Sequence, residues 1–179
     1  MAILEIKTVP AEVLRLKAKP VKSVDVEIKT QIINMIDTME NAPGAGLAAP
    51  QVGVSNRVIV VQFGDEEDEE VPPKTYAVVN PVISKPSKET VIGIEGCLSI
   101  PKIIGEVERS ESITIKGLNR YGQPFKLRAS GWLARIFQHE VDHLEGILFT
   151  DRATSLSMVE GENPEEIEAQ QIIIPKGTG

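Results

Sequence analysis

Apolar residues recur every three to four positions in two long segments of this chain, and this spacing predicts two amphipathic helices. The first covers residues 26–41, where one face carries Ile28, Ile32, Met35, Ile36 and Met39. The second covers residues 131–145, with Ser130 as its expected N-cap and Gly146 at the position that ends it. A shorter helix is predicted from Pro10 to Ala18, because proline suits the first turn of a helix.

Runs of β-branched and other apolar residues predict strands in the rest of the chain. Five are expected, at residues 57–63, 76–83, 90–98, 112–117 and 124–128. The last two flank the turn sequence Asn-Arg-Tyr-Gly at residues 119–122 and should form a hairpin. Parallel sheets need strands that alternate with helices, and this chain lacks that alternation. The predicted fold class is therefore α+β, with mostly antiparallel sheets around a central helix at residues 131–145.

The chain has 179 residues, of which 41% are hydrophobic, and this is enough for one domain with a core. Its net charge of −7 argues against a basic surface for nucleic acid, so no direct nucleic-acid site is expected. No apolar run has the features of a signal peptide or a membrane span. The single cysteine excludes an internal disulfide framework, and a free thiol suits a reducing compartment. We therefore expect a cytoplasmic protein without a membrane partner, although a mature organellar protein would share these features.

The reactive side chains gather in two short motifs, EGCLS at residues 95–99 and QHEVDH at residues 138–143. These motifs hold the only cysteine and both histidines of the chain. His139 and His143 are four residues apart, so on a helix both imidazoles face the same side and can reach one ion. Cys97 is the obvious third ligand, and water in the fourth position would complete a catalytic metal site.

Glu140 follows the first of these histidines and lies at the edge of the ligand face. From there a carboxylate can take a proton from a water molecule and return it later, while the metal lowers the pKa of that water. This arrangement is typical of metal-assisted hydrolysis. Asp142 points away from the ligand face, and we expect it to have a structural role.

Three alternatives remain open at this stage. The histidines could be solvated on a surface helix, with Cys97 as a small buried hydrophobic residue. A zincin-type metalloprotease has the same helix motif but a downstream third ligand, for which only Glu165 or Glu166 in the polar tail could serve. A metal-stabilised binding module would not need Glu140, so the presence of this carboxylate favours an enzyme.

A third unusual run, GAGLAAPQ, extends from Gly44 to Gln51. Its glycines allow the backbone to approach a ligand closely, and the Gln51 amide could donate to a developing oxyanion. Taken alone, the run is more typical of a turn between helix and strand. Together, the three runs resemble the signatures GxGLAAxQ, EGCLS and QHExDHL of the peptide deformylase family, with a match at every fixed position. The resemblance covers roughly residues 1–152.

The resemblance implies a metal-dependent hydrolase that removes the formyl group from the N-terminal formyl-methionine of newly made polypeptides and releases formate. It implies Fe2+ as the metal, although the ligand set suits Zn2+ at least as well, and purified protein could hold Zn2+, Ni2+ or Co2+. The site residues that it implies are Cys97, His139 and His143 as metal ligands, Glu140 as general acid and base, Gln51 and the backbone N–H of Leu98 as oxyanion donors, and the backbone of Gly46 as a contact to substrate.

Trp132, Arg135 and Ile136 lie seven, four and three residues before His139, on the ligand side of the predicted helix. They could simply belong to the core. The resemblance implies instead that they bind substrate, as walls of the pocket for its methionine side chain. Arg135 is expected to line this pocket with its methylene stem while its guanidinium reaches solvent.

The chain is predicted to divide into a catalytic domain at residues 1–152 and an acidic C-terminal tail at residues 153–179, which belongs to the same domain or is partly flexible. Residues 151–179 carry six acidic and two basic side chains, a net charge of −4. Bacterial members of the family act on chains that leave the translating ribosome, and some dock there through a basic C-terminal helix. This tail has the opposite charge, so we do not expect it to dock on RNA. A short helix at residues 165–171 and a strand at residues 172–174 could form within it.

Overall fold

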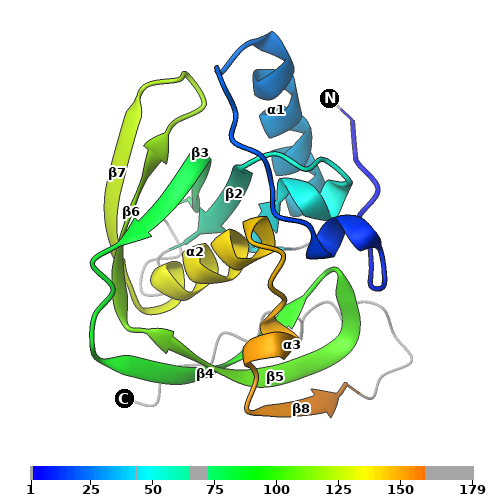
Figure 1. Cartoon of the computed structure of the whole chain (residues 1–179), viewed down its shortest axis with the longest axis vertical. Helices are drawn as coiled ribbons and strands as arrows, with labels where there is room; N and C mark the ends of the chain where they lie inside the picture. Colours follow the sequence, from blue (N-terminus) through cyan, green and yellow to red (C-terminus); the bar gives the residue numbers. More distant parts are fainter. Residues whose placement is uncertain (1, 43, 65–71, 160–179) are drawn as a thin grey trace.

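The computed structural model describes residues 2–42, 44–64 and 72–159, which fold into two antiparallel sheets around one central helix (Figure 1). The five-stranded sheet has the order β1-β2-β3-β6-β7, and the three-stranded sheet has the order β4-β5-β8. The strands are β1 (Gly46–Ala48), β2 (Val58–Phe63), β3 (Lys74–Ser84), β4 (Thr90–Cys97), β5 (Ile100–Ser110), β6 (Ser112–Leu118), β7 (Pro124–Ser130) and β8 (Ser155–Met158). The helices are α1 (Val26–Asn41), α2 (Gly131–Leu144) and α3 (Phe149–Arg152), with 3-10 turns η1 (Glu12–Arg15) and η2 (Ala49–Val52). The predicted α+β class with antiparallel sheets is confirmed.

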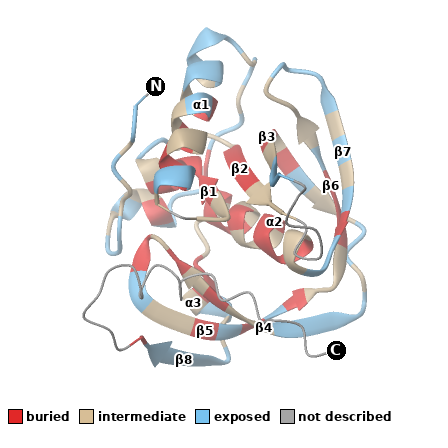
Figure 2. Cartoon of the chain, turned by 180° about the vertical axis from the view of Figure 1, so that it is seen from behind, coloured by how far each residue is buried: buried red, intermediate tan, exposed pale blue. Residues whose placement is uncertain are grey.

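The strand β2 is buried on both of its faces, which explains why its sequence is a continuous apolar run rather than an alternating one. Val58 and Val60 belong to the cluster that packs with α1, whereas Ile59 and Val61 belong to the cluster that packs with α2. Figure 2 shows the buried residues gathered where these helices meet the sheet. The two helices therefore cover opposite faces of the five-stranded sheet.

The central helix α2 is held in place along its length. Ser130 lies at the N-cap position as predicted, but its side chain makes no capping hydrogen bond. Gln138 exchanges two hydrogen bonds with the backbone of Ser110 in β5, accepting from its N–H at 3.1 Å and donating to its carbonyl at 2.9 Å. Gly146 follows the helix with a φ of +73°, at a point where a Cβ would lie 2.5 Å from a backbone carbonyl oxygen. Glycine is therefore required at the end of this helix.

The structure differs from the sequence predictions in the N-terminal segment and in the number of strands. The helix predicted from Pro10 to Ala18 is wrong, because only the short turn η1 forms there. Beyond this turn, Ala18 and Lys19 hydrogen-bond to distant parts of the backbone rather than to the preceding turn. The strands β1, β5 and β8 are additional to the predicted ones.

The strand β8 lies in the segment assigned to the acidic tail. It pairs antiparallel with β5 from Ser155 to Met158, so the ordered sheet extends beyond residue 152. The helix and strand expected at residues 165–174 lie outside the described residues, and the division of the chain at residue 152 stays a prediction. Within the described ranges, no helix is both long enough and apolar enough to cross a membrane.

Ile115 in β6 is fully buried against α2. Removing one methylene group with Ile115→Val should lower the free energy of unfolding by about 0.5–1.5 kcal/mol, because the neighbouring side chains relax only partly into the cavity. The same substitution at the exposed Ile92 should change it by less than about 0.5 kcal/mol. Urea unfolding followed by circular dichroism compares the two variants. Equal effects at both positions would contradict the placement of Ile115 in the core.

Candidate active site

Cys97, His139 and His143 meet at one point in the structure. Cys97 ends β4, and the two histidines lie one turn apart on α2. Cys97 Sγ is 3.3 Å from His143 Nε2, and one ligand atom from each residue lies within 4.8 Å of the other two. Bonds of about 2.0–2.3 Å to a tetrahedral ion place ligand atoms about 3.5 Å apart, so this donor set fits one divalent ion. The predicted metal site is present, and because His143 is buried, the alternative of two solvated histidines is excluded.

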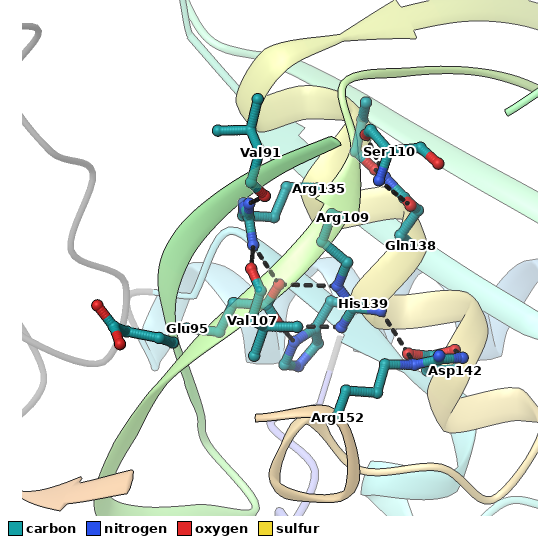
Figure 3. Close-up of polar contacts among 12 residues, drawn as sticks. Val91, Glu95, Val107, Arg109, Ser110, Arg135, Gln138, His139, Asp142 and Arg152 are labelled. Atoms are coloured by element: carbon teal, nitrogen blue, oxygen red, sulfur yellow. Dashed lines mark hydrogen bonds and ion pairs between the residues drawn. The ribbon is translucent and has the colours of Figure 1, made fainter. Parts of the chain in front are cut away.

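A buried carboxylate, Glu95, orients the ring of His139 (Figure 3). Glu95 Oε2 lies 2.9 Å from His139 Nδ1, and the tautomer that donates this hydrogen bond leaves Nε2 free for a metal. Arg109 donates two parallel hydrogen bonds to the same carboxylate, from Nε to Oε1 and from Nη2 to Oε2, each at 2.9 Å. Burial alone would raise the pKa of Glu95, but hydrogen bonds from Arg109 and His139 hold that pKa well below its ordinary value. Glu95 therefore stays charged at neutral pH.

The two imidazoles differ in their affinity for a proton. Burial alone would lower the pKa of His139, but hydrogen bonds to Cys97 and Glu95 raise this pKa well above its ordinary value. For His143, burial is the main cause and lowers the pKa well below the ordinary value. Metal ligation needs neutral imidazoles, so metal binding must displace a proton from His139.

Glu140 lines the same cavity as Cys97 and His139, and its carboxylate is buried. Its Oε2 has no hydrogen-bond partner among the described residues. The side chain packs on Gly46 in β1, where an added Cβ would lie 2.8 Å from Glu140 Cδ, so only glycine leaves room for it. Burial raises the pKa of Glu140 to about 7, whereas a dication at the ligand atoms would lower it. A buried carboxylate with a free oxygen is suited to proton transfer.

The side-chain amide of Gln51 is oriented by its neighbours. Its Oε1 accepts a hydrogen bond from the Ala48 N–H at 2.9 Å, which turns the NH2 group toward the metal ligands. Nε2 then lies 3.5 Å from Cys97 Sγ and 3.2 Å from Ser99 Oγ. The run GAGLAAPQ is therefore more than a plain turn, because β1 and η2 within it place an amide donor beside the ligands.

All of the predicted site residues except His143 line one cavity. Its walls are formed by Gly44, Ala45, Gly46, Gln51, Ile94, Glu95, Gly96, Cys97, Leu98, Trp132, Arg135, Ile136, His139 and Glu140. Ile136 also belongs to the core cluster on α2, so the core and pocket interpretations of this residue are both correct. β1 and β4, which border the cavity, are edge strands of their sheets. The cavity therefore combines apolar walls with unpaired strand edges next to the metal ligands.

Arg135 lines the cavity, but its guanidinium does not reach solvent, so that part of the prediction is wrong. Nη1 donates to Glu95 Oε1 at 2.9 Å and to the Val107 carbonyl at 2.8 Å, and Nη2 donates to the Val91 carbonyl at 2.6 Å. The guanidinium carbon lies 5.3 Å from the centre of the Trp132 ring. These partners compensate the loss of hydration, which allows the charge to be buried.

The sequence pattern predicts no role for two residues of this site, Glu95 and Arg109. Glu95 lies two positions before Cys97 on β4, and alternate residues of a strand share one face. This spacing was a usable signal for an acid near the metal ligands. Arg109 lies on β5, a strand that the sequence pattern does not predict, and it offers no comparable signal.

Comparisons with known proteins agree with this geometry. A family model described as polypeptide deformylase matches residues 3–158. The peptide deformylase of Symbiobacterium thermophilum is 49% identical over 175 residues, which cover 97% of this chain and 78% of that protein. The crystal structure of peptide deformylase from Thermotoga maritima superimposes with a TM-score of 0.80 at 41% identity and covers 87% of this chain and 100% of that chain. A class I type b peptide deformylase from Acinetobacter baumannii, solved with Met-Ala-Ser bound, has a TM-score of 0.76 at 38% identity, covering 84% of this chain and 98% of that chain. The chain therefore belongs to the polypeptide deformylase family of metal-dependent hydrolases.

Proposed function

We propose that this chain removes the formyl group from the N-terminal formyl-methionine of newly made polypeptides, with Glu140 as its general acid and base. One observation carries these roles. Glu140, whose Oε2 has no partner in the part of the chain that the structure describes, lines the same cavity as the Gln51 amide and Cys97. Neither side chain is needed to hold a metal, which argues against a binding module. The Met-Ala-Ser bound to the Acinetobacter baumannii relative supports a substrate that begins with methionine.

When bound by its three ligands, a divalent metal lowers the pKa of water and polarises a carbonyl group. Glu140 takes a proton from the attacking water as a new C–O bond forms at the formyl carbon. The oxyanion that develops receives hydrogen bonds from Gln51 Nε2 and from the Leu98 N–H. Glu140 then delivers its proton to the amine nitrogen, the C–N bond breaks, and formate leaves together with a peptide that has a free N-terminal methionine.

The walls of the cavity suit the methionine side chain of the substrate. Trp132 and Ile136 from α2 and Leu98 from the turn after β4 provide apolar surface, and the buried Arg135 closes one side. The free backbone groups of an edge strand can pair with an extended peptide. The backbone of Gly46 in β1 is therefore our candidate for the contact that fixes the direction of the substrate.

The ion that fills the site is proposed to be Fe2+, as in the family, although Zn2+, Ni2+ and Co2+ suit the same ligands. A thiolate ligand is most stable in a reducing compartment, which supports action in the cytoplasm. The translating ribosome is proposed as a partner because it is the source of formylated chains, and we expect no docking through the acidic tail. We expect no direct nucleic-acid site and no membrane partner.

The experiment that tests this function measures formate release after anaerobic purification, with metal analysis on the same sample. Formyl-Met-Ala-Ser should release formate, whereas acetyl-Met-Ala-Ser should release little acetate. If one ion is bound per chain and no formate appears from the formyl peptide, the deformylase function is contradicted. That result would favour the binding-module alternative.

Replacing Gln51 should reduce the rate without loss of metal. In Gln51→Glu the Ala48 N–H keeps an acceptor, but the donor that faces the oxyanion is lost. We expect kcat to fall about 10²–10³-fold, which is typical for removal of one oxyanion donor. Gln51→Leu, which also removes the bond to Ala48, should be at least as slow. A Gln51→Glu variant with normal kcat would show that this amide does not donate to the transition state.

A further inference from the structure

The charged contacts around the metal site do not end at Glu95. Arg109 uses its remaining edge to donate from Nη1 to Asp142 Oδ2 at 2.5 Å. Arg152 binds the same carboxylate with two hydrogen bonds, from Nε to Oδ2 at 2.6 Å and from Nη2 to Oδ1 at 2.8 Å. A continuous series of hydrogen-bonded side chains with alternating charges therefore runs from Arg152 through Asp142 and Arg109 to Glu95, and it ends at the ring of His139 (Figure 3).

The members of this series come from four elements of the fold, and two of them, Asp142 and His139, share α2. Glu95 lies on β4, Arg109 on β5, Asp142 on α2 and Arg152 at the end of α3. The inner members are shielded from water, since the side chains of Glu95, Arg109 and Asp142 are 4%, 5% and 11% exposed. The side chain of Arg152 is 45% exposed, so the series starts at the surface and ends at a metal ligand. The interaction energy of a charge pair that is shielded from water depends strongly on the distance between the two charges.

The hydrogen bonds along the series connect Arg152 at the surface to the orientation of the His139 ring. The guanidinium of Arg109 is a rigid plane held at two places, by the Glu95 carboxylate and by Asp142. Asp142 is in turn held by both guanidinium groups, and Arg152 spans both of its oxygens. Without Arg152, the Asp142 carboxylate keeps its bond to Arg109 Nη1 but loses the two bonds that fix its orientation, so it holds the Arg109 plane less firmly. Arg135 still holds Glu95 Oε1, so we expect the weaker hold of Arg109 to act mainly on Oε2, the oxygen that faces His139 Nδ1.

We propose that Arg152 is a positioning residue for the metal site, acting on the His139 ring through Asp142, Arg109 and Glu95. The proposal rests on the metal site of the proposed function. It assigns to α3 the role of keeping a metal ligand in position, in addition to its packing. Partners of metal-binding histidines typically contribute about 10–100-fold in metal affinity. Arg152 acts through three intermediates, so we expect an effect near the lower end of that range.

The chain offers a matched control in Arg15 of η1, whose partner Asp151 lies on the same short helix as Arg152. Arg15 binds Asp151 of α3 with two hydrogen bonds, and its side chain is 51% exposed, close to the value for Arg152. Both Arg15→Ala and Arg152→Ala remove a half-exposed guanidinium from an ion pair that involves α3. Only the second of these substitutions touches the series that leads to His139.

The test uses full-length protein loaded with Co2+, whose visible absorption reports ligand geometry, and follows release of the ion to a chelator. We expect about 10-fold faster release and an altered Co2+ spectrum for Arg152→Ala, partial recovery for Arg152→Lys, and wild-type behaviour for Arg15→Ala. Equal release rates for the two alanine variants would overturn the proposal. Faster release with an unchanged Co2+ spectrum would also overturn it, because that pattern indicates local opening of α3. Neither readout needs substrate, so the result is independent of whether formate is the product.

Discussion

Glu140→Gln is expected to lower kcat/KM for formyl-Met-Ala-Ser about 10²–10⁴-fold, the usual contribution of general acid–base catalysis. Glutamine has almost the same shape and fits the space that Gly46 leaves, but its amide cannot take a proton from water. Glu140 lies outside the set of three metal ligands, so the metal content should stay at the wild-type value. The measurement combines formate release with metal analysis of the purified variant.

A matched control for this variant is Glu145→Gln, the same substitution just after the end of α2. Glu145 pairs with Lys17 and Arg57 and does not line the cavity. Its loss should leave kcat/KM unchanged. An active Glu140→Gln variant would remove Glu140 from the mechanism, and a variant that has lost its metal would show that Glu140 helps to hold the ion.

The second large effect is expected at Glu95, where Glu95→Ala leaves Arg109 and Arg135 buried without their shared carboxylate. Breaking a buried ion pair by removing one partner costs about 3–5 kcal/mol, because the remaining charge is uncompensated. We expect a loss of this size in the unfolding free energy of metal-free protein, measured with urea at pH 7. Metal affinity should fall about 10–100-fold as well, because His139 loses the acceptor that orients it. A loss below about 1 kcal/mol would contradict the buried ion-pair network.

The contribution of Glu95 to the free energy of unfolding should decrease as the pH falls. Its pKa is held well below the ordinary value in the folded protein, whereas about 4.3 is expected in the unfolded chain. The stability from this group is therefore fully present above the unfolded pKa and is lost as the pH falls toward the folded pKa. The stability difference between wild type and Glu95→Gln, both metal-free, should shrink below about pH 4. A difference that stays constant between pH 5 and pH 3 would contradict the lowered pKa.

The helices α1 and α2, five of the strands and the metal ligands could be predicted from local patterns. The period of α2 and the spacing of His139 and His143 are visible within a few residues of sequence. The strand β5 could not be recognised in the same way, because the charged Arg109 occupies a buried position and breaks the apolar alternation. The sequence pattern predicts a helix where only the turn η1 forms, because it does not show that Ala18 and Lys19 pair with distant backbone.

The network around the ligands depends on contacts between distant parts of the chain. Glu95 is the first residue of the EGCLS motif, yet its hydrogen bond to His139 joins residues 44 positions apart. The same limit explains Arg135, whose buried guanidinium depends on Glu95 and on the carbonyl of Val107. A single sequence shows that these charges exist, but only the fold shows which of them are neighbours.

The most direct test of the central claim is a titration of metal-free protein with Fe2+ under anaerobic conditions, with formate release from formyl-Met-Ala-Ser as the readout. We expect activity to rise linearly until one ion is bound per chain and then to stay constant, with no such rise in Cys97→Ala. Full activity before any metal is added, or a linear rise that continues to two ions per chain, would contradict a single metal centre at Cys97, His139 and His143.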